Sequence, residues 1–158
     1  MKVSIVSVSL FAALVATPAL AANDGFHPGS FCVLAAAGTT AYVDNRIENR
    51  GSGQVTIECP LFVRDASATG KVRVQALDRS LSGTVACSLG TMVSGSVSYV
   101  DLPGTSGHTG GWQVTTLTGA TVGFGSTSNP RSNWVECLVP APYLGQYSAV
   151  GAYYFIDN

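Results

Sequence analysis

Apolar and polar residues alternate along several short segments of the chain. In the segment "GQVTIECPLFV", Ile57, Cys59 and Leu61 are apolar or weakly polar, whereas Glu58 between them is charged. Successive side chains of a β-strand point to opposite faces of a sheet. The two-residue period therefore predicts a strand with one buried face and one polar face, in which Cys59 points inward. Pro60 cannot donate a backbone hydrogen bond, so we expect an edge or a bulge there.

Two further cysteines occupy the same position in a similar pattern. Apolar residues lie two places to either side of each cysteine, and the residues between them are polar or small. These segments are Val85-x-Cys87-x-Leu89 and Val135-x-Cys137-x-Val139. The repeated pattern predicts half-buried antiparallel strands whose cysteines share the interior with apolar neighbours.

The remaining segments also show strand periodicity. In "KVRVQAL", Val72, Val74 and Ala76 are predicted to face inward, and "MVSGSVSYVDL" is interpreted as one alternating strand. The last segment, Tyr147–Ile156, is apolar or aromatic on both faces. This pattern predicts a central strand covered on both sides. The alternative is a strand that pairs with another subunit and allows self-association.

Turn-forming residues separate these segments. Residues 22–30 are expected to be a loose lead-in, and a polar loop is expected after a strand fragment around Tyr42 and Val43. No helical period extends over ten residues outside the N-terminal segment. The sequence therefore predicts an all-β fold: a single disulfide-stapled antiparallel β-sandwich or jelly roll of about eight to nine strands.

The first residues have the features of a secretory signal peptide. Lys2 precedes an apolar run over residues 3–15, and Ala19-Leu20-Ala21 matches the small-x-small pattern of a cleavage site. The run is shorter than the roughly 20 residues that span a bilayer. We expect cleavage near Ala21, one domain over residues 22–158, no membrane insertion of the mature chain, and a secreted, periplasmic or cell-surface location.

The four cysteines are expected to form two disulfides. Their spacings of 27, 28 and 50 residues, with two isolated histidines, do not fit a zinc site, so no metal is expected. An even number of cysteines in a secreted chain favours disulfides. Three pairings are open, and we favour Cys32–Cys59 with Cys87–Cys137.

The charge of the chain argues against nucleic acid as a partner. The protein has eight basic and nine acidic residues, and no basic cluster occurs. Neutralising a phosphate backbone needs clustered Lys and Arg. We therefore expect no nucleic-acid partner.

No catalytic motif is complete in the sequence, and no cofactor motif was found. The segment "GTSGH" fails the last position of G-x-S-x-G. A small hydrolase would have to use His108 as its base, with Asp101 nearby. Glu58 and Glu136 both precede a strand cysteine and would meet on one face if their strands paired in register. We expect both carboxylates to face water, and we predict no enzymatic activity.

Aromatic residues are the remaining candidates for a binding site. A sugar ring packs on an indole while its hydroxyls bind polar neighbours, so Trp112 beside the 103–111 loop is the leading candidate. His108 and Tyr99 are further candidate ligand contacts. The strand position of Trp134 is taken to indicate the core.

In the order of these segments, the chain resembles a group of small secreted bacterial proteins of uncharacterised function. The resemblance rests on "GSFC", "YVDNRIENRGSGQVTIECPLFVRD", "VRVQALDRSLSGTVACSL", "VECLVP" and "YSAVGAYYFID". It implies a bacterial, disulfide-linked β domain and transfers no catalytic residue. We expect a non-enzymatic module whose partner is a glycan or a cell-surface component. The alternative is a surface or pilus-like assembly subunit.

Overall fold

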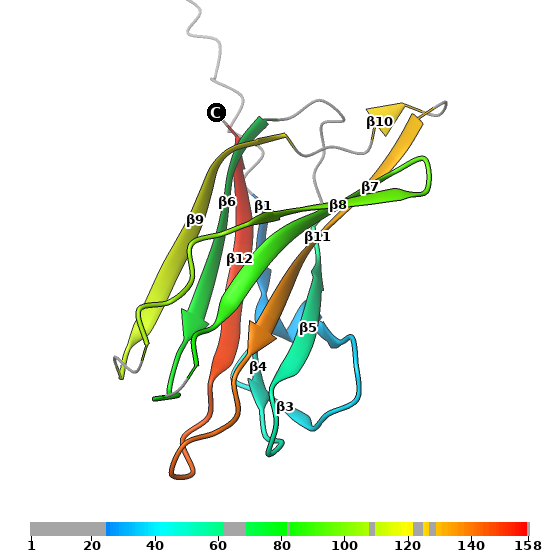
Figure 1. The fold of residues 1–158 in the computed structure, drawn as a ribbon. Coiled ribbons are helices and arrows are strands. Elements are labelled where there is room, and N and C mark those ends of the chain that lie inside the picture. Colours follow the sequence, from blue (N-terminus) through cyan, green and yellow to red (C-terminus); the bar gives the residue numbers. More distant parts are fainter. Residues whose placement is uncertain are drawn as a thin grey trace, which may run out of the picture.

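Two antiparallel sheets lie face to face and enclose the interior of the protein (Figure 1). The computed structural model describes residues 25–61, 69–81, 83–107, 110–121, 125–126 and 129–157. Within them, the strands are β1 (Gly25–Pro28), β2 (Val33–Leu34), β3 (Thr40–Val43), β4 (Arg46–Asn49), β5 (Val55–Pro60), β6 (Thr69–Leu77), β7 (Ala86–Val93), β8 (Ser96–Asp101), β9 (Trp112–Thr121), β10 (Gly125–Ser126), β11 (Asn129–Val139) and β12 (Ala149–Asp157). The predicted β-sandwich is confirmed.

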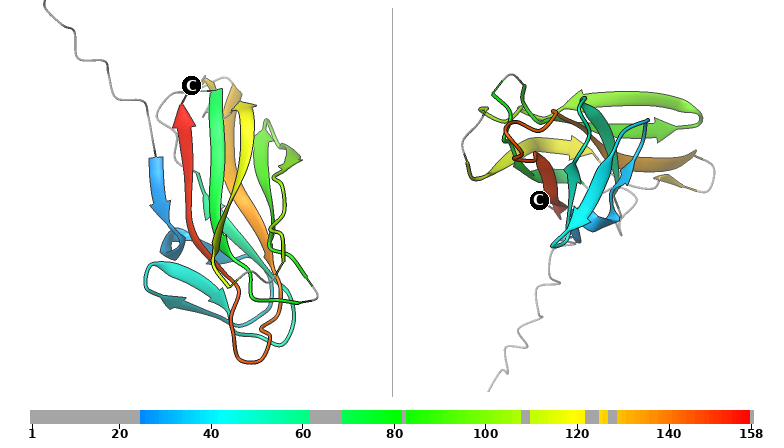
Figure 2. Two further views of the ribbon diagram at one scale, coloured as in Figure 1. Left: turned by 90° about the vertical axis from the view of Figure 1, so that its left-hand side faces the viewer. Right: turned by 90° about the horizontal axis from the view of Figure 1, so that it is seen from below.

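Each sheet has six strands among the described residues. The first, called here the β12 sheet, has the order β3-β4-β12-β6-β9, and β1 also pairs with β12. The second, the β11 sheet, has the order β2-β5-β11-β7-β8, with β10 beside β11. Figure 2 shows the two layers from the side, with the β3–β4 hairpin near one end.

The inward faces of both sheets form one apolar core. Val72, Val74 and Ala76 are fully buried, as their alternation predicts. From the opposite sheet, Ile57 and Val135 are also fully buried and belong to the same cluster. Regular alternation along each strand thus fixes which side chains remain on the outer faces.

Both disulfides involve the β11 sheet: one joins β7 to β11, and the other joins β5 to the residue that precedes β2. Cys32 bonds to Cys59 and Cys87 bonds to Cys137, with S–S distances of 2.05 Å and 2.08 Å. This is the favoured pairing. Cys87 and Cys137 are direct partners on β7 and β11, and all four cysteines are buried. The bridges therefore link neighbouring segments of one layer, and they do not join the two layers.

β12 is a central strand, as one of the two interpretations predicts. It pairs with β6 along one side, and with β4 and β1 along the other. The β11 sheet covers its inward face, where Val150, Tyr153 and Phe155 are fully buried. Tyr154 and Ile156 on the outer face are only partly buried, so the predicted cover on both faces is incomplete. The alternative, in which this segment pairs with another subunit, finds both edges of β12 already occupied from Ala149 to Phe155, apart from Gly151.

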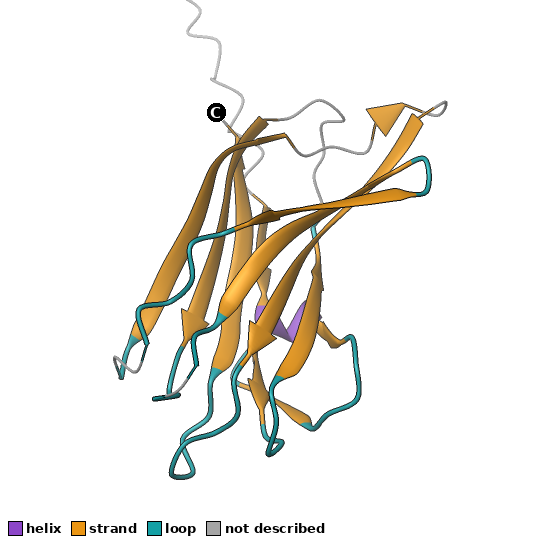
Figure 3. Ribbon diagram, in the orientation of Figure 1, coloured by secondary structure: helices purple, strands orange, loops and turns teal. Residues whose placement is uncertain are grey.

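Two segments expected to be irregular are strands. Gly25–Pro28 pairs with β12, although its turn-rich composition predicted a loose lead-in. Arg46–Asn49 forms a hairpin with β3, where a polar loop was expected. Tertiary pairing overrides weak local preference in both cases, because each segment completes an edge of β12. Most of the described residues lie in strands, and a short 3-10 turn spans Gly29–Phe31 (Figure 3).

The segment interpreted as one strand from residue 92 to 102 is instead part of a hairpin. Ser94 and Gly95 have φ angles of 48° and 83°, which suit a tight turn between β7 and β8. β8 returns along β7, where Val97 pairs with Met92 and Tyr99 with Gly90. The alternation of apolar and polar residues continues through the turn, so the sequence pattern did not show that the chain reverses direction there.

Buried polar side chains hold the turns at one end of the sandwich. Asp78 is fully buried and accepts hydrogen bonds from the backbone N–H of Ser80 and Val85 and from the hydroxyl of Thr105. A carboxylate with several donors is well suited to fix a turn. This network fixes the start of the turn after β6, which carries Arg79.

Candidate functional site

Trp112 lies on the outer face of the β12 sheet. It is the first residue of β9, and it pairs with Leu77 of β6. Its side chain remains 41% exposed, whereas Thr115, on the other face of β9, is buried. The predicted candidate is therefore accessible to a ligand on an otherwise regular sheet.

The indole of Trp112 extends across β6 to β12. Three atoms of its six-membered ring, Cζ3, Cη2 and Cε3, lie 2.5, 2.7 and 3.3 Å from the place where a Cβ of residue 151 would stand. Only glycine, which has no Cβ, leaves room for the ring at this position. The register of β12 also shifts between Val150 and Ala152, so Gly151 sits at a β-bulge. The bulge and the missing side chain together form the seat of the ring.

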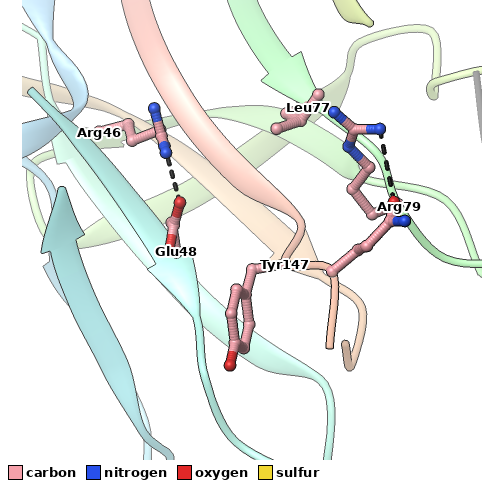
Figure 4. A pocket seen from close by; sticks show the side chains of 6 residues that line it. Arg46, Glu48, Leu77, Arg79 and Tyr147 are labelled. Atoms are coloured by element: carbon pink, nitrogen blue, oxygen red, sulfur yellow. Dashed lines mark hydrogen bonds and ion pairs between the residues drawn. The ribbon is translucent and has the colours of Figure 1, made fainter. Parts of the chain in front are cut away.

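A recess lies on the same face, beside Leu77. We call it the arginine recess; it encloses about 320 Å³ and is lined by Arg46, Glu48, Leu77, Arg79, Gln146 and Tyr147. Figure 4 shows Arg46 and Arg79 on opposite sides of it, with Tyr147 between them. The recess thus gathers side chains from β4, the end of β6 and the segment before β12.

Strand register places Trp112 in line with the recess. Glu48 pairs with Ala149, Ala149 with Leu77, and Leu77 with Trp112. Directly paired residues point to the same face of a sheet. Glu48, Leu77 and Trp112 therefore lie in one row across the outer face, and we call this row together with the arginine recess the Trp112 face.

Glu48 organises one side of the recess. Its carboxylate is almost fully buried and accepts a hydrogen bond from Arg46 Nε at 2.7 Å. Its other oxygen forms an ion pair with Arg50. A buried carboxylate bound by two guanidinium groups fixes both in position. This pairing keeps Arg46 oriented along the wall of the recess.

Arg50 also stacks on Tyr147. The guanidinium carbon lies 3.7 Å from the centre of the ring, a cation–π contact. Desolvation acts against the charged form, but hydrogen bonds with Glu48 and Tyr147 outweigh it and raise the pKa of Arg50. Arg50 therefore stays cationic and keeps the ring of Tyr147 in contact with its guanidinium.

The other side of the recess is formed by Arg79. Its Nη1 donates to Oε1 of Gln146 at 3.4 Å, and its backbone N–H donates to the hydroxyl of Ser148 at 2.9 Å. Ser148 is fully buried. The backbone of Arg79 is therefore anchored, while its guanidinium contacts a neutral amide at the long end of hydrogen-bond distances.

Aromatic and acidic side chains occupy the opposite outer face, on the β11 sheet. Tyr99 and Trp134 meet edge to face, with ring centres 5.9 Å apart at 89°. Trp134 fills the space above Gly90, where a Cβ would lie 2.3 Å from the ring. Tyr99 is 51% exposed, and partial desolvation together with the charges of Glu136 and Glu58 raises the pKa of its hydroxyl.

Glu58 and Glu136 pair directly on β5 and β11 and lie on this same outer face. Glu136 also lines a depression of about 340 Å³ with Ser88, Asp101 and Leu138. Among the described residues, no group of three or more His, Cys, Asp or Glu side chains is arranged to hold a metal ion. The two carboxylates give this face a negative character.

The structure separates the three predicted ligand contacts. Trp112 and Tyr99 lie on opposite outer faces of the sandwich, so they do not form one site. His108 lies outside the described residues. Trp134 was assigned to the core, and this is wrong: it alternates with inward Val135 and therefore shares the outer face with Glu136.

Sequence reasoning missed the arginine recess. Arg46 and Glu48 lie two residues apart, which would place them on one face of a strand, but their segment was expected to be a loop. Arg79 follows Asp78 in the turn after β6 and is distant from Arg46 in the sequence. Asp78 is buried, caps this turn, bonds to Thr105 and does not line the recess. No local pattern in the sequence places β4 and the end of β6 on the two sides of β12.

Comparison with known proteins gives similarity in fold alone. No family model matches the sequence, and no curated protein matches it significantly. The CBM22-2 xylan-binding domain of Xyn10C from Paenibacillus barcinonensis is similar, with a TM-score of 0.57 and 10% identity over 85% of this chain and 99% of that chain.

A second solved structure is similar over the same share of this chain. The xylan-binding module CBM86 from Roseburia intestinalis has a TM-score of 0.50 and 15% identity, over 85% of this chain and 96% of that chain. Both neighbours are carbohydrate-binding modules. The protein therefore shares a β-sandwich fold with these two structures. In the part of the chain that the structure describes, no helix is long and apolar enough to cross a membrane.

Proposed function

We propose that this protein is a secreted, non-enzymatic carbohydrate-binding β-sandwich whose ligand stacks on Trp112. The observation that carries the proposal is the seat of the indole: the ring is held over Gly151 and remains 41% exposed. An indole fixed in this way offers an apolar surface to the C–H face of a sugar ring. Little side-chain entropy is lost on binding, because the protein has already oriented the ring.

Polar partners for sugar hydroxyls lie on the same face. Arg46, Arg79 and Gln146 line the recess beside Leu77, which pairs with Trp112. Small-molecule sites typically combine an apolar surface with a few polar groups in fixed positions. The Trp112 face has both, and the similarity in fold to xylan-binding modules is consistent with this use.

A secreted location is supported by the two disulfides, which form and persist in oxidising compartments. The proposed signal peptide, residues 1–21, lies outside the described residues. N-terminal sequencing of the protein recovered from the periplasm or the medium should begin at Ala22. A chain that retains Met1 there would contradict the proposed cleavage.

Affinity electrophoresis of the secreted protein tests the binding function. Gels should contain xylan, galactan, mannan or polygalacturonate, and the two tryptophans provide matched variants. We expect at least one glycan to retard the wild type, Trp112→Ala to lose at least tenfold in affinity, and Trp134→Ala to stay within twofold. Absence of retardation in every gel, or equal binding by Trp112→Ala, would overturn the proposal.

A reducing-end assay tests the proposal that the protein is not an enzyme. The wild type should release no reducing ends from any glycan that it binds during prolonged incubation. Release that disappears in a variant of Glu58 or Glu136 would identify a glycosidase instead.

A further inference from the structure

The arginine recess concentrates positive charge in a protein that is negative overall. The chain carries a formal net charge of −1, yet Arg46, Arg50 and Arg79, three of its eight basic residues, gather at one corner of the β12 sheet. Among the described residues that line the recess, Glu48 is the only one with a carboxylate. Asp44 contacts Arg46 from the margin at 3.7 Å, and its side chain is 83% exposed, so water screens its charge.

We propose that the saccharide bound at the Trp112 face carries a carboxylate, and that Arg46 and Arg79 bind this group. This inference rests on the proposed carbohydrate-binding function. It identifies the ligand class as a uronic-acid saccharide, in which the carboxylate is attached directly to a pyranose ring. A ring stacked on Trp112 can then present its own or its neighbour's carboxylate to the recess.

The hydrogen-bond geometry of Arg46 leaves donors for such a ligand. Its Nε donates to Glu48, and its Nη1 lies beside exposed Asp44. A guanidinium group has five N–H donors in a planar fork. Arg46 therefore has more N–H donors than these two contacts use, and a carboxylate from the ligand can bind them while Glu48 keeps the guanidinium oriented.

Arg79 complements Arg46 from across the recess. Its guanidinium contacts the neutral amide oxygen of Gln146 at 3.4 Å. Figure 4 marks a contact of Arg79 with a dashed line. A carboxylate forms shorter and stronger bonds with arginine than a neutral amide does. We therefore expect an anionic group to compete with Gln146 for the guanidinium of Arg79, and the buried Asp78 network to hold the backbone during this exchange.

The charge of the opposite outer face supports placing the carboxylated ligand on the Trp112 face. Glu58 and Glu136 lie side by side on the outer face of the β11 sheet, with Asp101 beside the same depression. An acidic polysaccharide would be repelled there. The two outer faces thus differ in charge, and only the Trp112 face is suited to a carboxylated glycan.

Isothermal titration calorimetry of the secreted protein tests the inference with three ligands of similar length: hexagalacturonate, xylohexaose and a sulfated hexasaccharide. Arg79→Gln removes one guanidinium of the recess. Lys71→Gln removes one positive charge from the same sheet, six residues away from Leu77 along β6, and is the matched control. Circular dichroism should confirm that both variants fold.

We expect hexagalacturonate to bind at least tenfold more tightly than xylohexaose, Arg79→Gln to abolish this preference, and Lys71→Gln to retain it within twofold. The proposed function survives and this inference is overturned if xylohexaose binds through Trp112 as tightly as hexagalacturonate. A sulfated ligand that binds as tightly as the uronate would overturn the carboxylate assignment in favour of charge alone. If no saccharide binds, both proposals are wrong.

Discussion

The hydroxyl of Tyr153 donates a hydrogen bond to the backbone carbonyl of Pro60 at 2.8 Å, and this bond joins the two sheets. Tyr153 lies on β12, and Pro60 ends β5 in the opposite layer. Both disulfides lie within one layer, so the connection between layers depends on side-chain packing and on contacts of this kind. The ring of Tyr153 is fully buried, and His27 stacks on it at 5.2 Å.

Replacing Tyr153 with Phe should lower the free energy of unfolding. The substitution keeps the ring and its packing but leaves the Pro60 carbonyl without this donor. A buried acceptor that loses its partner costs about 1 to 3 kcal/mol. Urea denaturation at pH 7 should show a loss in this range, and a loss below about 0.5 kcal/mol would mean that water or another donor replaces the hydroxyl.

Alkaline pH should act through the same hydroxyl. Burial raises the pKa of Tyr153 from 10.0 to about 12 in the folded protein. Because the folded pKa is the higher one, the stabilising contribution is complete below pH 10 and is lost as pH rises from about 10 to about 12. The free energy of unfolding of the wild type should therefore fall more steeply over this interval than that of Tyr153→Phe. Parallel pH profiles would contradict this expectation.

Gly151 and Gly90 offer a matched pair of substitutions. A Cβ at either position would overlap a tryptophan ring, Trp112 over Gly151 and Trp134 over Gly90. We expect Gly151→Ala to displace Trp112 and weaken glycan binding about tenfold, because the stacking surface is no longer seated. Gly90→Ala should disturb only the opposite face and leave affinity within twofold. Equal effects of the two variants on affinity would contradict the assignment of the binding face.

The buried carboxylate of Asp78 should matter more for stability than an exposed one. Asp78→Ala removes the acceptor for two backbone N–H groups and for the hydroxyl of Thr105. We expect a loss of about 2 kcal/mol or more in the free energy of unfolding. Asp44→Ala is the control, because its side chain is 83% exposed and its ion pair with Arg46 spans 3.7 Å. That variant should change stability by less than about 0.5 kcal/mol.

The two disulfides should contribute unequally. They close segments of 27 and 50 residues, and chain entropy predicts stabilisation of about 3.5 and about 4 kcal/mol. Replacing both members of one bridge with alanine should therefore destabilise the protein slightly more for Cys87 and Cys137 than for Cys32 and Cys59. A thiol assay on the denatured, unreduced wild type should detect no free cysteine. Detection of free thiols would contradict the assigned pairing.

The sequence predicted the layers of this fold well where burial sets the pattern. Cys59, Cys87 and Cys137 point inward because their strands alternate, and the interpretation needed no tertiary information. It failed where pairing decides the structure. The hairpin at Ser94–Gly95 continues the alternation of both strands, and Gly25–Pro28 has little strand propensity until β12 provides a partner.

The candidate site shows the same division. Trp112 could be singled out because it directly follows the Gly-, Ser- and Thr-rich segment 103–111. Its side chain is exposed, as a ligand contact requires. The arginine recess could not be predicted, because Arg46, Arg79 and Tyr147 come from three separate segments. Only the register of β4, β12 and β6 brings them together, and a one-residue slip would turn them to opposite faces.

Fluorescence titration of the Trp134→Phe variant tests the central claim most directly, because Trp112 is then the only tryptophan in the chain. If the ligand stacks on this ring, a saccharide that binds in calorimetry should shift the emission to shorter wavelength, with a midpoint equal to the calorimetric Kd. A bound saccharide that leaves the emission of Trp112 unchanged would place its site elsewhere and contradict the account.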